Sequence, residues 1–180
     1  MMGNIISIDE YYQDNDTILS FPDDYNESLD NVIIAPTTIT IFFNDDFNHS
    51  LDNVKLPNSI KQIYFGFCFN QPLNNVTMPS NLQSLSFGFM YAQSLDKIIF
   101  PPTLNHISFN GTIQQSINNL PSTITELSFH VITRDILNLP FSLKKITIRS
   151  TNLLNSSIAH LKKIPYGCTI HDLYGNIIKN

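Results

Sequence analysis

The sequence predicts a mainly β solenoid, a single domain of about six to seven repeats with parallel sheets. The first observation behind this prediction is a near-constant period, because six prolines follow one another at intervals of 21, 22, 22, 20 and 19 residues. A fixed period of about 20 to 50 residues is typical of repeat proteins, in which each unit packs on its neighbours. The prolines are Pro36, Pro57, Pro79, Pro101, Pro121 and Pro140.

The second observation is the apolar pattern around each proline. In the copy that begins at Pro79, Leu82, Leu85 and Phe87 lie three, six and eight residues after the proline. The alternation of apolar and polar positions predicts a strand. A second alternating pair precedes each proline, so we expect two short strands per repeat and parallel sheets with one strand from each repeat. These pairs are Val32 with Ile34, Val54 with Leu56, Val76 with Met78, and Ile98 with Phe100.

The two ends of the chain depart from the regular pattern. A degenerate first copy begins near Thr17, because residues 21–29 align with residues 43–51. Near the other end, Leu154, Ile158 and Leu161 share one face of an expected short capping helix, which Lys162 and Lys163 would favour at its C-terminus. The expected divisions are an N-terminal cap or flexible segment at 1–16, the repeat solenoid at 17–165 and a C-terminal cap at 166–180.

Two neighbouring copies share a longer motif. They read Phe65-Gly66-Phe67-Cys68-Phe69-Asn70-Gln71-Pro72-Leu73 and Phe87-Gly88-Phe89-Met90-Tyr91-Ala92-Gln93-Ser94-Leu95. With this motif the chain resembles the FNIP repeat family over about residues 17 to 165. The resemblance implies leucine-rich-repeat-like units of about 22 residues, known chiefly from social amoebae and from large DNA viruses of amoebae.

Family members often carry an N-terminal F-box, which makes them substrate receptors of a ubiquitin ligase. Only about sixteen residues precede the first copy here, which is too few for that domain, so we expect no F-box in this chain. A separate feature of the N-terminus is Met2-Gly3, which fits an N-myristoylation pattern if translation starts at Met2.

The outward positions of the repeats supply the candidate binding residues. Side chains five, seven and nine residues after each proline should form columns on the sheet, with an aromatic end at Phe42 and Tyr64. Exposed aromatic and arginine side chains often anchor interfaces, whereas the alternative is an ordinary solvated sheet face. The polar and charged end contains His106, Glu126, His130, Lys145 and Arg149.

A recurring asparagine follows the predicted strand in three copies. Asn26, Asn48 and Asn70 are expected to form a structural ladder, since a carboxamide both donates and accepts and can therefore bond the backbones of adjacent loops.

The sequence contains no pattern typical of catalysis, so we expect no enzyme, no catalytic residues and no cofactor. The five histidines lack metal-ligand spacing, the six glycines are too scattered for a phosphate loop, and no Gly-x-Ser-x-Gly motif occurs. The absence of an aromatic-basic motif argues against nucleic acid, and the absence of a long apolar run argues against a membrane.

Cysteine use and charge bear on location and assembly. Cys68 and Cys168 lie in distant repeats, so we expect two reduced thiols and a cytoplasmic protein, in the host cytoplasm if the chain is viral. Residues 1–54 hold eleven of the fifteen acidic residues and no Lys or Arg, whereas residues 55–180 hold all ten basic residues. Such a separation favours steered or head-to-tail association.

The function expected from these observations is a protein–protein interaction module that presents a repeat-built sheet face to an unidentified protein partner. One alternative is a substrate-recognition subunit of a ubiquitin-ligase assembly that recruits an F-box in trans. Another is a self-assembling structural protein whose oppositely charged ends stack.

Overall fold

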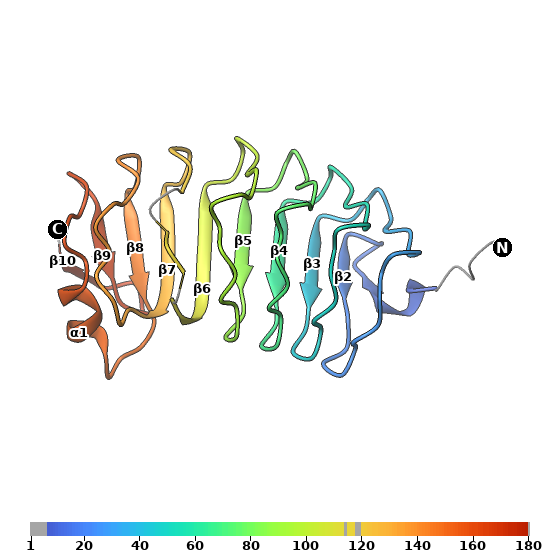
Figure 1. Ribbon diagram of the computed structural model, residues 1–180, viewed down its shortest axis with the longest axis horizontal. Coiled ribbons are helices and arrows are strands. Elements are labelled where there is room, and N and C mark those ends of the chain that lie inside the picture. Colours follow the sequence, from blue (N-terminus) through green and yellow to red (C-terminus); the bar gives the residue numbers. More distant parts are fainter. Residues whose placement is uncertain (1–6, 114, 118–119, 180) are drawn as a thin grey trace.

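The computed structural model describes residues 7–113, 115–117 and 120–179. The Met2-Gly3 motif and the start of the expected N-terminal segment lie outside these residues. Within them the chain forms one ten-stranded sheet whose strands follow chain order from β1 to β10, side by side along the long axis (Figure 1). The strands are β1 (Tyr12–Gln13), β2 (Ile18–Ser20), β3 (Thr40–Phe43), β4 (Gln62–Phe65), β5 (Ser84–Phe87), β6 (His106–Thr112), β7 (Glu126–Val131), β8 (Lys145–Ile148), β9 (Thr169–His171) and β10 (Ile177–Lys179).

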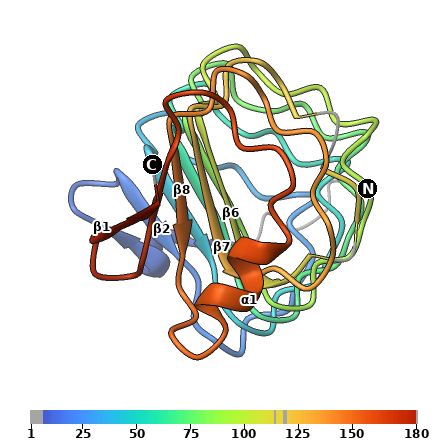
Figure 2. The same ribbon diagram turned by 90° about the vertical axis from the view of Figure 1, so that its left-hand side faces the viewer.

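Strands β2 to β9 pair in parallel, one strand per turn of the coil, and the repeat positions stay in register. Ile63 pairs with Ile41 on one side and with Leu85 on the other, so equivalent side chains stack on each other. Figure 2 looks along the solenoid from its C-terminal end and shows the strands gathered on one side of the coil. The predicted mainly β solenoid with a parallel sheet is confirmed.

The second strand expected in each repeat does not form. The segment 32–34 is extended and alternates in burial, with Ile33 73% exposed between the buried Val32 and Ile34, but it belongs to no strand. Two features limit the donors for a ladder there: the first N–H bonds within its own turn, as from Val54 N to Leu51 O at 3.0 Å, and a proline without an N–H follows each segment. The solenoid therefore has a sheet on one side and extended chain on the other.

Two columns of stacked rings fill the core between these sides. In the first four repeats, one ring comes from the end of the strand and the other from the turn that follows, as with Phe65 and Phe69, whose centroids are 3.9 Å apart. Phe65 also stacks on Phe43 at 5.2 Å, and Phe69 stacks on Phe47 at 6.1 Å. Aromatic pairs contribute about 0.5–1.5 kcal/mol each beyond the area they bury, so the stacks tie the repeats from β2 to β7 to their neighbours.

The backbone segments that follow β3, β4 and β5, together with the end of β6, approach one another too closely for a side chain. A Cβ added to Gly88 would lie 1.6 Å from the Gly66 carbonyl oxygen, and one added to Gly66 would lie 2.1 Å from the Asn44 oxygen. Gly111 has the same constraint against Phe89. Glycine is needed here because the backbones nest together. Gly66 and Gly88 are therefore packing positions, and the outward column predicted nine residues after each proline does not run through them.

Two short helical elements occur among the residues that the structure describes. The 3-10 helix η1 (Asp9–Tyr11) precedes β1, and the helix α1 (Leu154–Ala159) lies within the region 153–163 where the sequence predicted one. The buried Ser157 hydroxyl accepts a hydrogen bond from Ile132 N at 3.0 Å, which ties α1 to the loop after β7. At the C-terminal end of α1, Lys162 Nζ donates to the Ala159 oxygen at 2.9 Å, as expected for a cation at a helix C-terminus.

We predict that Gly88→Ala lowers the free energy of unfolding by about 3 kcal/mol or more, since two backbones must separate to admit the methyl group. The comparison variant is Gly175→Ala, where φ is +86° but no atom lies within 4 Å of the added Cβ. That variant should lose only about 1 kcal/mol from backbone strain. Denaturant unfolding of both proteins measures the difference, and equal losses would contradict the nested packing.

Candidate interaction face

The outward side of β3 to β8 forms one surface, which we call the sheet face. Two columns of side chains in strict register build it, and both were recognisable as repeat positions. The first column is Thr40, Gln62, Ser84, His106, Glu126 and Lys145. The second column is Phe42, Tyr64, Ser86, Ser108, Ser128 and Thr147.

One end of the sheet face is aromatic. The rings of Phe42 and Tyr64 stack at 4.6 Å with an angle of 10° between their planes, and both side chains are half-buried. Parallel register places the two residues directly opposite each other on β3 and β4, which fixes the stack without help from any loop. We call this half-buried pair of stacked rings the aromatic platform.

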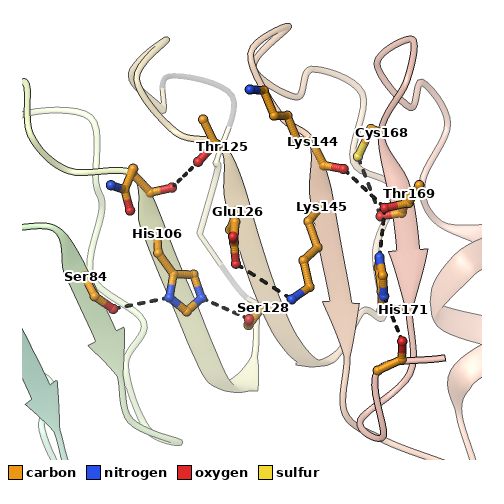
Figure 3. A network of polar contacts seen from close by, with 12 residues as sticks. Ser84, His106, Thr125, Glu126, Ser128, Lys144, Lys145, Cys168, Thr169 and His171 are labelled. Atoms are coloured by element: carbon orange, nitrogen blue, oxygen red, sulfur yellow. Dashed lines mark hydrogen bonds and ion pairs between the residues drawn. The ribbon is translucent and has the colours of Figure 1, made fainter. Parts of the chain in front are cut away.

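The middle of the sheet face is a hydrogen-bonded chain centred on His106. Its Nδ1 lies 3.3 Å from Ser84 Oγ on β5, and its Nε2 lies 3.0 Å from Ser128 Oγ on β7 (Figure 3). Burial lowers the pKa of His106, with Arg149 and Lys145 adding to that effect and the Glu126 carboxylate opposing it. The imidazole is therefore held in its neutral form, as a donor to one serine and an acceptor from the other.

Arg149 crosses the sheet face. Its backbone N donates to the oxygen of Phe129 in β7 at 2.8 Å, but its side chain reaches over β7 to β6. There the Nη2 nitrogen lies 2.9 Å from Ser108 Oγ, 3.1 Å from the Phe109 oxygen and 2.6 Å from Asn110 Oδ1. Burial lowers the pKa of the guanidinium. The three contacts hold the charged group in one position above β6.

The seven predicted binding residues thus fall into two groups and one outlier. His106, Glu126, Lys145 and Arg149 come together over β6 to β8, where Lys145 Nζ lies 3.9 Å from Glu126 Oε2. That pair is 43% and 49% exposed, so it contributes little to stability. Phe42 and Tyr64 form the separate aromatic platform. His130 is exposed on β7, and its carbonyl oxygen accepts from Ser150 N at 2.9 Å.

The residues that the sequence reasoning missed are the small ones beneath these side chains. Ser86 and Ser108 are only 5% and 4% exposed, because Asn110 Nδ2 bonds Ser86 Oγ at 3.2 Å and Arg149 covers Ser108. The signal was present as a run of serines at one repeat position, in Ser86, Ser108 and Ser128. Of these, Ser86 lies between the platform and the guanidinium, where the Asn110 carboxamide covers it.

The three asparagines lie along the edge of the solenoid and link consecutive turns. Asn26 Oδ1 accepts from Asn48 N at 3.0 Å, Asn48 Oδ1 accepts from Asn70 N at 2.9 Å, and Asn70 Oδ1 accepts from Ala92 N at 2.9 Å. Each carboxamide serves here as an acceptor. A second bond between the same two loops comes from the residue after the next asparagine: Gln71 Nε2 donates to the backbone oxygen of Asn48 at 2.9 Å.

Among the described residues, no three His, Cys, Asp or Glu side chains gather as metal ligands, and no helix is long and apolar enough to cross a membrane. Cys68 and Cys168 are both free thiols, with Cys168 buried.

Stacked strands in parallel register, with stacked rings behind them, define a leucine-rich-repeat-like solenoid. The chain belongs to the FNIP repeat family, whose model matches residues 25–68, 69–112 and 91–131. Among solved structures it is similar to CroV588, described as a novel circular LRR protein, with a TM-score of 0.61 and 24% identity. That match covers 87% of this chain and 27% of the other, so this chain spans about a quarter of that protein. A search of curated proteins found no match.

We predict that Asn48→Ala lowers the free energy of unfolding by about 1 to 2 kcal/mol, because the half-buried N–H of Asn70 and the amide of Gln71 lose an acceptor. Asn48→Asp should lose less, since a carboxylate oxygen accepts the same bonds. The control is Asn53→Ala in an exposed turn, which should be near neutral by denaturant unfolding. Equal effects at the two positions would contradict the ladder.

The lowered pKa of His106 predicts a pH dependence of stability. In the unfolded chain His106 has its ordinary pKa of 6.5, whereas in the folded protein its pKa is lower. The stability that neutral His106 contributes is therefore complete above pH 6.5 and is lost as the pH falls below that value. The free energy of unfolding should therefore drop more for the wild type than for His106→Gln between about pH 7.5 and 5. Parallel curves for the two proteins would show that burial of His106 has no such effect.

Proposed function

We propose that this protein is a protein–protein interaction module that presents the sheet face to a protein partner and performs no catalysis. The observation that carries the proposal is the combination, on one rigid surface, of the Phe42–Tyr64 platform with a fixed arginine. Both are side-chain types that often dominate binding energy at interfaces. A sheet in strict register holds them in place before binding, which reduces the entropy lost on association.

The contacts of His106 favour binding over chemistry. A histidine between two serines could resemble a nucleophile and its base, but a serine nucleophile also needs backbone N–H groups that stabilise an oxyanion. Ser84 and Ser128 lie within β5 and β7, where the backbone groups are engaged in the parallel ladder. One surface hollow lies away from these serines, beside Ile34 and Leu56 on the side opposite the sheet.

Location and assembly are part of the proposal. Two free thiols support a reducing compartment such as the cytoplasm. A ubiquitin-ligase role with an F-box supplied in trans is a narrower form of the same function.

Self-assembly is favoured by one observation, the formal charge of −11 over residues 1–54 against +6 over residues 55–180. Sedimentation at low and high salt tests it, because charge-driven stacking weakens as salt rises.

We predict that the double variant Phe42→Ser and Tyr64→Ser loses partner binding while keeping the fold, because serine already occupies the same repeat position in β5, β6 and β7. Affinity purification from native cells with quantitative mass spectrometry should show recovery of the main partner falling about tenfold, which corresponds to 1.4 kcal/mol.

The control for that experiment is Ile99→Ser, at a position 83% exposed on the side opposite the sheet. Its partner recovery should match that of the wild type. Loss of the partner with Ile99→Ser alone would move the interface to the other side of the coil. Ligase subunits as the dominant partners would support the narrower role, and recovery of only the protein itself would support self-assembly.

A further inference from the structure

We propose that the sheet face binds an extended acidic segment of the partner protein, with Arg149 as the receptor for a carboxylate and the Phe42–Tyr64 platform as the contact for an apolar side chain. This inference rests on the proposed function and specifies the chemistry of the partner.

The charge of Arg149 is not neutralised within the described part of the chain. Its hydrogen bonds go to neutral oxygens of Ser108, Phe109 and Asn110, and no carboxylate of the described residues forms an ion pair with it. All three bonds use Nη2, which leaves the N–H groups of Nε and Nη1 without an acceptor from those residues. A half-buried cation without a counter-charge is costly, and a carboxylate from outside offsets that cost.

The Arg149 side chain is held in place before a ligand binds. The three contacts at 2.6 to 3.1 Å hold the guanidinium over β6, so little side-chain freedom remains to be lost when an anion binds. The half-buried position also strengthens the attraction to an anion relative to that of a fully solvated arginine.

The surrounding charges favour a single carboxylate over a phosphate group. Phosphate-binding sites usually gather several arginines, whereas only Arg149 is unpaired on the sheet face. The nearby Lys145 already faces Glu126 at 3.9 Å, and the Glu126 carboxylate would repel a dianion more strongly than a monoanion. The site therefore matches the side chain of aspartate or glutamate.

The register of the sheet gives the spacing of the ligand. Tyr64 pairs with Ser86, which pairs with Ser108 beneath the Arg149 guanidinium. Strands lie about 4.8 Å apart, so two intervals separate the platform from the guanidinium by about 10 Å. An extended chain rises about 3.3 Å per residue, which places the acidic residue about three positions from the apolar one. The segment between these two residues would pass over the Asn110 carboxamide, which bonds both Ser86 and Arg149 and covers the serines.

The test uses NMR of the full-length protein labelled with ¹⁵N. The chain has two arginines, Arg134 and Arg149, so Arg149→Gln identifies the Nε–Hε signal of Arg149 by its loss. The probe is the peptide acetyl-Leu-Ser-Ser-Glu-amide. Its counterparts end in glutamine or phosphoserine, and a fourth peptide, acetyl-Leu-Glu-Ser-Ser-amide, changes the spacing.

We expect the glutamate peptide to shift the Arg149 signal saturably, with a Kd about tenfold lower than that of the glutamine peptide. Arg149→Lys keeps the charge but not the planar donors and should bind several-fold more weakly, as judged from backbone amide shifts of β4 to β6. Lys97→Gln removes one positive charge from an exposed turn, so its affinity should stay within about twofold of the wild type.

Four results would overturn the proposal. Three concern the peptides: equal affinity for the glutamate and glutamine peptides, tighter binding of the phosphoserine peptide, or equal affinity for the two peptides that differ in spacing. The fourth is a shift of the Arg149 signal when the protein concentration alone is raised, which would identify a second copy as the occupant. If the peptides fail while the Phe42→Ser and Tyr64→Ser variant still loses its cellular partner, the proposed function stands and only the acidic chemistry is wrong.

Discussion

The packing of each turn against the next is the constraint on which the rest of the structure depends. One repeat buries few apolar side chains by itself, and ordering its backbone costs roughly 1–2 kcal/mol per residue. Rings such as Phe65 and Phe69 offset that cost only because Phe43 and Phe47 already lie behind them. The nested glycine loops and the asparagine bonds act at the same boundary between turns. Stability and the alignment of the sheet face therefore have one origin.

Much of this architecture was predictable from the sequence. The alternation at positions such as Ile63 and Phe65 predicted the strands, and the near-constant period predicted that equivalent residues would be neighbours. The prediction of a second strand was wrong. An alternating pattern indicates which side chains are buried and which are exposed, but it does not indicate whether a neighbouring strand is present to form hydrogen bonds. Val76 and Met78 are buried as expected, but the extended segment that carries them has no ladder.

The candidate site was only partly predictable. Phe42 and Tyr64 could be paired because parallel register follows directly from the repeat. The contact between Arg149 and Ser108 could not, since it joins residues 41 positions apart and depends on a long side chain crossing an intervening strand. Similarly, Gly66 and Gly88 were assigned to an outward column by counting positions, whereas the distance between neighbouring loops gives them a packing role.

The extended side of the coil, which lacks a ladder, has a consequence for how such chains vary in length. Only the strands are tied into a sheet, so the extended segments can change their path without breaking inter-strand bonds. The repeats shorten from 22 residues to 19 along this chain while β5 to β8 remain aligned. Insertions and deletions can therefore accumulate on one side of the solenoid while the spacing of side chains on the other is preserved, so repeat length can vary without altering the sheet face.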